Sequence, residues 1–206
     1  VAMLKADIVV FESRHNAMLP SVESLRARGV PVVCRLWSQV PIPQQVLPDV
    51  PYIVLSEASA AWYRAQGVRD PIILPPVILS EDYRVESERQ SVVSIGVVRE
   101  KGFDLMIEVA ALCPEIPFEV YASWGKTPED LVTRARTLPN MRVHPPTRDM
   151  KAVYRKARIL AAPSLMETWG RTVTEAQFSG IPAIARDVGA LREAVAGGGV
   201  MMPSDA

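Results

Sequence analysis

Segments rich in β-branched residues alternate with segments of helical periodicity along the whole chain. Residues 6–11, 29–37, 51–56 and 91–98 have the composition of strands, and residues 57–67 carry apolar side chains at helical spacing. Further helical segments are expected at 103–110, 128–138, 150–157 and 191–196, and further strands at 118–123, 141–145, 158–164 and 180–186. This alternation is typical of α/β folds built on largely parallel sheets. We therefore expect the α/β fold class.

The length of 206 residues allows one or two domains. Paired prolines end the apolar segment 71–77, and the charged segment 80–90 that follows shows no periodicity. Such a combination of breakers and charge is typical of a connection between domains. We expect a first domain over residues 1–79 and a second over residues 80–206.

Composition excludes several classes of protein. Hydrophobic residues make up 49 % and charged residues 22 %, which is ordinary for a folded globular chain. Lys and Arg together number 23, and so do Asp and Glu together, so the net charge is zero. The chain therefore has no excess of positive charge that would favour nucleic acid as a partner. No apolar run approaches the length of a transmembrane segment, and no signal peptide is visible. Cys34 and Cys113 lie in apolar runs and are expected to be core thiols of a cytoplasmic protein.

The stretch from Ala162 to Val195 is the most informative part of the chain. It reads as the end of a strand, a turn that contains Gly170, a helix near 171–179 and a further strand. In open α/β sheets, ligands bind beyond the carboxyl ends of the strands, where the first turns of helices point. Free backbone N–H groups there favour anions. The sequence thus predicts an anion site near Gly170.

Two carboxylates flank this turn, and two interpretations of them are open. Glu167 and Glu175 are separated by seven residues, and both carboxylates could accept hydrogen bonds from the hydroxyls of a sugar or ribose. Alternatively, Ser164 with Glu167 and Thr172 with Glu175 each match a capping box, in which the glutamate binds a backbone N–H. Spacing alone favours the capping interpretation.

The motifs "PSLMETWGRTVTEA", "SGIP" and "VGALREA" follow one another between residues 163 and 194. In order and spacing they resemble the signature of retaining nucleotide-sugar glycosyltransferases of the GT-B fold, family 4 (glycosyl transferases group 1). This resemblance implies two Rossmann-like, doubly wound parallel-sheet lobes. Residues 1–79 resemble the second half of the N-terminal acceptor lobe, and residues 80–206 resemble most of the C-terminal donor lobe.

The resemblance extends upstream to "IGVVREKGFDLMIEVAAL", which is similar to the first strand, loop and helix of the donor lobe. In that family a lysine before a glycine and a nearby arginine hold the diphosphate. Lys101 matches the lysine, and Arg99 stands for the arginine. The family's arginine directly follows the strand glycine, whereas Arg99 lies three residues after Gly96. The structural alternative for Arg99 and Lys101 is a solvated turn.

The family's activity implies transfer of a hexose from a UDP- or GDP-sugar to an acceptor, with retention of anomeric configuration. Glu167 and Lys101 are the catalytic residues that the resemblance implies, with Glu167 on a sugar hydroxyl and Glu175 on the ribose. Arg171 either adds its positive charge to the cationic wall that Lys101 forms beside the diphosphate or points to solvent. His15 is a candidate acceptor-side residue. The full set implied for donor binding is Arg99, Lys101, Glu167, Thr168, Trp169, Gly170, Arg171, Thr172 and Glu175.

No bound cofactor and no metal ion are expected, since the family stabilises the leaving diphosphate without a metal. The acceptor is open between a sugar, a lipid-linked molecule and another small molecule. A lipid-linked acceptor would make peripheral membrane association an option. Two other functions remain: a module of the same fold that binds nucleotide sugars without turnover and, ranked lower, a nucleotide-sugar 2-epimerase.

Overall fold

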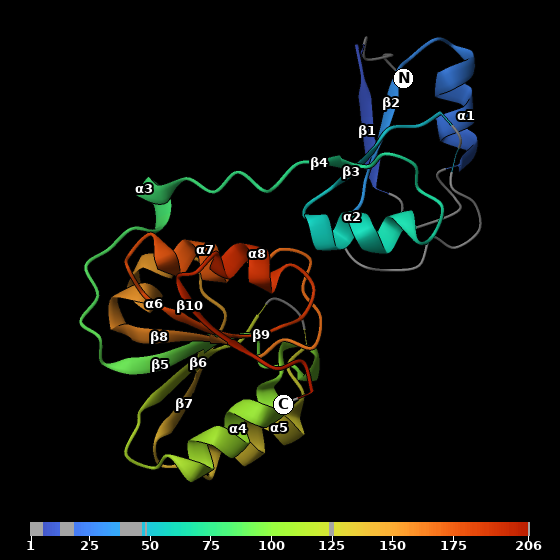
Figure 1. Ribbon diagram of the computed structural model, residues 1–206. Helices are drawn as coiled ribbons and strands as arrows, with labels where there is room; N and C mark the ends of the chain where they lie inside the picture. The colour runs from blue at the N-terminus through green and yellow to red at the C-terminus, as the bar shows by residue number, and fades with distance from the viewer. Residues whose placement is uncertain (1–5, 13–18, 38–46, 48, 124–125, 206) are drawn as a thin grey trace. The chain divides into compact units, whose positions relative to one another are not determined.

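The computed structural model describes residues 6–12, 19–37, 47, 49–123 and 126–205. The chain forms two compact units, Val1–Pro76 and Val77–Ala206, and the division lies just ahead of the predicted boundary after residue 79. Each unit contains a parallel sheet with helices between its strands (Figure 1). The expected α/β fold class is therefore confirmed. No helix in the described part of the chain has the length and apolar character of a membrane span.

The first unit contains a four-stranded sheet in the order β1-β2-β3-β4, with all neighbouring strands parallel. This order follows the chain, as expected when each strand is joined to the next by a crossover on the same side of the sheet. Its elements are β1 (Val9–Glu12), α1 (Leu19–Ala27), β2 (Val32–Arg35), β3 (Tyr52–Val54), α2 (Glu57–Arg64) and β4 (Ile72–Ile73).

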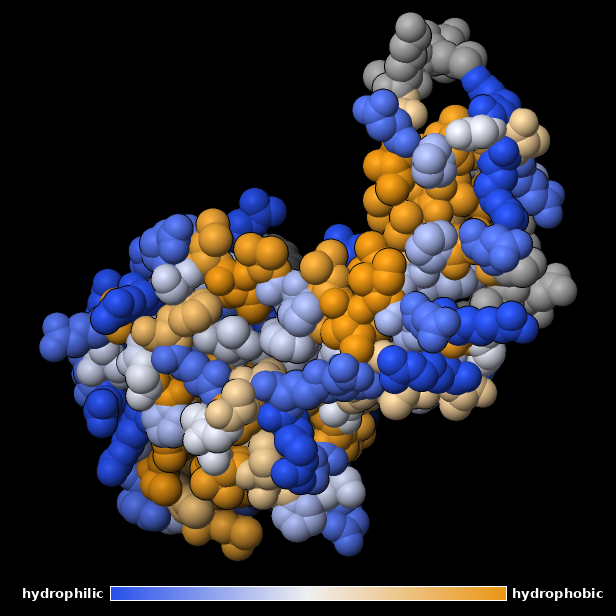
Figure 2. Space-filling view, turned by 45° about the horizontal axis from the view of Figure 1, so that its top comes forward, coloured by the Kyte–Doolittle hydropathy of each residue, from blue (hydrophilic) through white to orange (hydrophobic). Residues whose placement is uncertain are grey.

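Among the residues that the structure describes, only one face of this first sheet has a buried core. Phe11, Cys34 and Val54 lie on that face and pack with buried residues of α1 and α2. The strand register places Val10 and Ile72 on the other face, and both are about half exposed. Hydrophobic side chains gather at the surface of this unit (Figure 2). Parallel sheets are usually covered on both faces, so this surface is unusually apolar.

The second unit contains a six-stranded parallel sheet in the order β10-β9-β8-β5-β6-β7. Its strands are β5 (Ser91–Ile95), β6 (Phe118–Tyr121), β7 (Met141–His144), β8 (Ala157–Ala162), β9 (Ala183–Arg186) and β10 (Gly199–Met202). Its helices are α3 (Ser80–Tyr83), α4 (Phe103–Leu112), α5 (Glu129–Arg136), α6 (Met150–Lys156), α7 (Arg171–Gln177) and α8 (Leu191–Val195), with a 3₁₀ turn at Arg99–Lys101.

Helices cover both faces of this larger sheet, with α4 and α5 on one side and α6, α7 and α8 on the other (Figure 1). Phe103 and Leu131 are fully buried in the first layer, and Tyr154, Val173 and Leu191 are fully buried in the second. The sequence predicted each of these helices and the strands β5 to β9. It did not predict α3 or β10, because the first lies in a charged stretch and the second begins in a run of glycines.

Candidate functional site

The order of strands in the second unit reverses beside β5. From β5 the chain proceeds outward to β6 and β7, and it then returns to place β8 on the other side of β5. The carboxyl ends of β5 and β8 therefore form a switch point, which is where open α/β sheets bind ligands. A hollow lies at these strand ends, lined by Ser94, Ile95, Lys101, Ala161, Ala162, Pro163, Ser164, Glu167, Gly170, Thr172 and Leu191.

Two glycines let the loop after β5 bring Lys101 into this hollow. Gly96 has a φ of +111°, and a Cβ atom there would lie 2.7 Å from Cγ of Lys101. The stem of Lys101 therefore lies directly over the Gly96 backbone. Gly102 ends the 3₁₀ turn in the left-handed region, with φ at 71°, and precedes the first residue of α4. Both conformations are ones that glycine adopts without steric cost.

The loops that follow β5 and β8 are in direct contact. The Leu165 N–H donates to the carbonyl of Glu100 at 2.9 Å. A Cβ atom on Gly102 would lie 2.1 Å from the carbonyl oxygen of Pro163, so only glycine allows the backbones to approach so closely. The Glu167 carbonyl is held in turn by the Ala190 N–H at 3.0 Å. These contacts bring two residues far apart in the sequence, Lys101 and Glu167, to the lining of one hollow, where their side chains meet.

Lys101 and Glu167 form an ion pair across the hollow, between Nζ and Oε2. The Lys101 side chain is 37 % exposed and that of Glu167 is 18 % exposed, so a ligand can reach the pair from solvent. The Thr168 N–H donates to Glu167 Oε1 at 3.3 Å. Both residues that were expected to be catalytic therefore line the same hollow. The Lys101 ammonium supplies a cation there, and the Glu167 carboxylate beside it supplies a hydrogen-bond acceptor.

Helix α7 follows this loop and is capped by Gly170, whose φ is 89°. No side chain forms a hydrogen bond at this cap, and Thr172 already lies inside the helix and lines the hollow. The capping interpretation of Thr172 with Glu175 is therefore wrong, because Thr172 is not the residue at the cap. The helix begins at Arg171, directly after Gly170, and only glycine takes the left-handed conformation readily at that cap.

Glu175 is buried, with 3 % of its surface exposed, and is not among the residues that line the hollow. Its Oε1 accepts from Arg171 Nε at 2.6 Å and its Oε2 accepts from the Tyr154 hydroxyl at 2.7 Å. Burial, together with the nearby Glu175 carboxylate, raises the pKa of Tyr154 far above its usual value, so this hydroxyl stays protonated. The Glu175 side chain is thus an acceptor held by two donors.

Arg171 was open between a cationic wall and a solvent-exposed position, and the structure leaves its side chain 59 % exposed while binding it to two neighbours. Besides Glu175, its guanidinium binds the Tyr83 hydroxyl through Nη2 at 2.5 Å. The hydrogen bond to Glu175 is the main cause that raises the pKa of Arg171. The neighbouring Trp169 has a buried indole N–H without a hydrogen-bond partner among the described residues. Neither Arg171 nor Trp169 lines the hollow.

Arg99 does not join Lys101. Its guanidinium binds Asp130 and lies 3.5 Å from Asp104, at the α4–α5 side of the unit, and its side chain is 52 % exposed. The hydrogen bond to Asp130 raises the pKa of Arg99 and keeps the group charged. The structure thus pairs Arg99 with acidic side chains of α4 and α5 instead of placing it beside Lys101. The physical reason is that two acidic side chains of α4 and α5 neutralise it locally.

Replacing Arg99 with alanine is therefore expected to leave the affinity for nucleoside diphosphates within about twofold, since an exposed ion pair contributes little. Isothermal titration of the variant and the unmodified protein with UDP measures this. A loss of tenfold or more would show that the guanidinium leaves Asp130 and reaches the ligand.

Of the chain's two histidines, the structure describes only His144. His15 lies outside the described residues. His144 ends β7, binds the buried Glu119 carboxylate and stacks on Tyr121 with ring centroids 4.5 Å apart. In the described part of the chain, no three His, Cys, Asp or Glu side chains are grouped to hold a metal ion.

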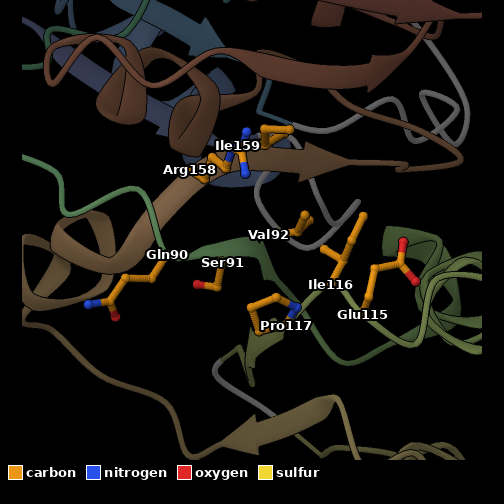
Figure 3. A pocket seen from close by; sticks show the side chains of 8 residues that line it. All are labelled: Gln90, Ser91, Val92, Glu115, Ile116, Pro117, Arg158 and Ile159. Atoms are coloured by element: carbon orange, nitrogen blue, oxygen red, sulfur yellow. The ribbon is translucent and has the colours of Figure 1, made fainter.

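A second hollow lies at the opposite edge of the sheet, where β5, β6 and β8 begin (Figure 3). Arg158 is an extra residue in the pairing there, because Ser91 pairs with Ala157 and Val92 with Ile159. Figure 3 shows Arg158 and Glu115 on different sides of this hollow. Since ligands of open α/β sheets bind at the carboxyl edge, the hollow beside Lys101 is the candidate functional site.

Sequence reasoning missed Tyr83 and Tyr154, which hold Arg171 and Glu175. Tyr83 lies 88 positions before Arg171 and Tyr154 lies 21 positions before Glu175. The one available signal for Tyr154 is its place on the apolar side of a predicted helix. Tyr83 lies in a stretch without periodicity, and no pattern in the sequence links it to the site.

A known family matches the part of the chain that contains this hollow. The family model of glycosyl transferases group 1 matches residues 89–206, which is more than half of the chain. The chain belongs to this family. Its matched region contains the whole hollow, from Ser94 to Leu191.

Curated relatives match over short regions. D-inositol 3-phosphate glycosyltransferase of Corynebacterium glutamicum is 51 % identical over 53 residues, which are 26 % of this chain and 13 % of the relative. The enzyme of the same name from Mycolicibacterium gilvum is 36 % identical over 107 residues, which are 48 % of this chain and 24 % of the relative. The chain thus matches about an eighth to a quarter of the length of these relatives.

Solved structures share the fold over nearly the whole chain. Anabaena HepE in complex with UDP-glucose aligns with a TM-score of 0.78 and 18 % identity, over 96 % of this chain and 65 % of HepE. A glycosyltransferase from Rickettsia africae aligns with a TM-score of 0.77 and 12 % identity, over 96 % of this chain and 62 % of that protein. The two parallel sheets with alternating helices are those of the GT-B fold.

Proposed function

We propose that this protein transfers a hexose from a nucleoside diphosphate sugar to an acceptor, and that the donor binds in the hollow at the ends of β5 and β8. The observation that carries the proposal is the meeting of Lys101 and Glu167 across this hollow at the switch point of the sheet. The chain's membership in the glycosyl transferases group 1 family supports it.

The two side chains have complementary roles in this proposal. The Lys101 ammonium binds the diphosphate and stabilises the negative charge that grows on it as the bond to the sugar breaks. The Glu167 carboxylate accepts a hydrogen bond from a hydroxyl of the sugar ring. Because both groups are held by packed loops, they are oriented before the donor arrives. Donor binding exchanges the Lys101–Glu167 pair for contacts of each group with the donor.

Glu175 is proposed to accept from the ribose hydroxyls. Thr172 lines the hollow and lies three residues before Glu175, so the two share one face of α7. Each carboxylate oxygen has room for more than one hydrogen bond, and each receives a single one from Arg171 or Tyr154. The buried carboxylate can therefore take further donors.

We propose UDP as the nucleoside diphosphate, with GDP as the other option. HepE, which shares the fold, has been solved with UDP and with UDP-glucose. Retention of anomeric configuration and independence of a metal ion are further parts of the proposal, together with a cytoplasmic location. The acceptor is proposed to be a sugar, a lipid-linked molecule or another small molecule.

The test measures donor binding and product release separately. Titration calorimetry with UDP and GDP should show saturable binding of one of them. Lys101→Ala should weaken it about tenfold, since an ammonium–phosphate contact is charge-assisted but here partly exposed to solvent. Lys156→Ala is the matched control, because Lys156 lies at the opposite edge of the sheet beside Ser91. Unchanged affinity of the Lys101 variant would contradict the site.

Product analysis then decides the reaction. The purified protein is incubated with UDP- and GDP-hexoses and candidate acceptors, with and without a chelator, and the product is examined by proton NMR. Release of the nucleoside diphosphate with a product of the donor's anomeric configuration supports transfer with retention. Binding without turnover would show a non-catalytic module, and a sugar altered at C2 would show an epimerase.

A further inference from the structure

Glu175 stands at the centre of a chain of polar contacts that extends beyond the hollow. Arg171 Nε donates to its Oε1 at 2.6 Å and the Tyr154 hydroxyl donates to its Oε2 at 2.7 Å. The Tyr83 hydroxyl accepts from Arg171 Nη2 at 2.5 Å, so it holds the arginine at its other end. Each carboxylate oxygen thus has its own donor, and the arginine is fixed at two nitrogens.

Burial restricts the Glu175 and Tyr154 side chains, whereas the Arg171 side chain is 59 % exposed. Glu175 is 3 % exposed and Tyr154 is fully buried. A buried carboxylate that lost its donors would be strongly destabilised, because water could not replace them. Glu175 therefore cannot turn freely between rotamers, and the plane of its carboxylate is set by the positions of Arg171 and Tyr154.

The far end of the chain of contacts is held by the backbone of another segment. Tyr83 is the last residue of α3, which lies ahead of β5 and close to the start of this unit. The Val85 N–H donates to the Ser179 hydroxyl at 2.9 Å, and the Ser179 hydroxyl donates to the Tyr83 carbonyl at 3.4 Å. The α3 segment is thus fastened to the residues just after α7, and the Tyr83 hydroxyl is kept next to Arg171.

We propose that Tyr83, Arg171 and Tyr154 are positioning residues that fix the Glu175 carboxylate, which in the proposed function accepts from the ribose hydroxyls of the donor. This inference rests on the proposed function, because it assumes that a nucleoside diphosphate binds beside Thr172. It assigns a role in donor recognition to α3, a segment outside the residues 89–206 that the family model matches.

The test compares UDP with 2′,3′-dideoxyuridine diphosphate, which keeps the base and the diphosphate but lacks both ribose hydroxyls. Tyr83→Phe removes a single oxygen and keeps the ring. It should weaken UDP binding about fivefold, as the loss of one hydrogen bond does, and leave binding of the dideoxy ligand unchanged. Arg171→Ala should weaken UDP binding about tenfold or more, because its bond to Glu175 is charged.

A double-mutant cycle separates positioning from general packing. In a Glu175→Gln background, Tyr83→Phe should have no further effect on UDP binding, because the group that it orients has lost its charge. Tyr52→Phe is the matched control, since its hydroxyl also accepts one hydrogen bond, from the Leu47 N–H at 2.9 Å, in the other unit. Thermal unfolding of every variant checks that it is folded.

The outcomes distinguish the two proposals. If the unmodified protein binds neither UDP nor GDP, the proposed function itself fails. If it binds UDP and Tyr83→Phe weakens both ligands equally, or neither, the positioning role is overturned while the donor site stands. If Arg171→Ala does not fold, Tyr83→Phe and the cycle with Glu175→Gln still decide the question.

Discussion

Glu167→Gln should lower the rate of hexose transfer by about a hundredfold, while UDP binds at least as tightly as to the unmodified protein. Glutamine has the same shape but no charge. It therefore gives a weaker hydrogen bond to the sugar hydroxyl in the transition state. It also leaves Lys101 without its ionic partner and removes a carboxylate that repels the incoming diphosphate. Initial rates of UDP release and calorimetric titration with UDP measure the two effects.

Glu108→Gln provides the comparison for this change, since Glu108 is exposed on α4 and belongs to the same unit. It should alter neither the rate nor the affinity. A Glu167 variant that transfers sugar at the normal rate would contradict the catalytic role of Glu167. A variant that loses UDP binding in proportion to its rate would show that Glu167 holds the loop rather than the sugar.

Gly102→Ala should lower the free energy of unfolding of the second unit by about 3 kcal/mol or more, because left-handed strain and overpacking act together. The added Cβ atom would lie 2.1 Å from the Pro163 carbonyl oxygen, which is backbone and cannot turn away. The loops that carry Lys101 and Glu167 would then have to separate. Thermal unfolding should show a melting temperature lower by roughly 10 °C, and UDP affinity should fall with it.

Gly180→Ala isolates the conformational part of this cost. Gly180 has a φ of +64°, close to that of Gly102, but an added Cβ atom there would meet no atom within 4 Å. Its substitution should cost only about 1 kcal/mol, the strain of a left-handed alanine. Equal destabilisation by the two substitutions would show that the contact between Gly102 and Pro163 does not hold the loops together.

Most of the second unit could be predicted because its strands and helices differ clearly in period. The helix at Phe103–Leu112 buries Phe103, Met106, Ile107 and Ala110 at helical spacing, and the strand at Phe118–Tyr121 is buried throughout. Two elements escaped prediction because they lack that signal. The α3 helix has no buried residue, and β10 begins at a glycine and is defined by its pairing with β9.

The site was predicted in part. The resemblance led to Lys101 and Glu167, and the structure places both at one hollow. It also led to Arg99, which the structure pairs with Asp130 and Asp104 instead. The partners of Arg99 lie on the two helices α4 and α5, and the packing of these helices against each other is a property of the folded chain. No local pattern around residue 99 could reveal it.

The amino-acid sequence was sufficient for the fold class, for the elements of the second unit other than α3 and β10, and for the family motif. These features depend on local periodicity and on fixed spacing within short stretches of the sequence. Both can be recognised from residues that are close together in the chain. Only the folded structure shows that Lys101 pairs with Glu167 and that Arg99 pairs with Asp130. It also shows that Tyr154 binds Glu175 and that Tyr83 binds Arg171. Each contact joins side chains that are remote in the chain, and the packing of strands, loops and helices places them within hydrogen-bond distance.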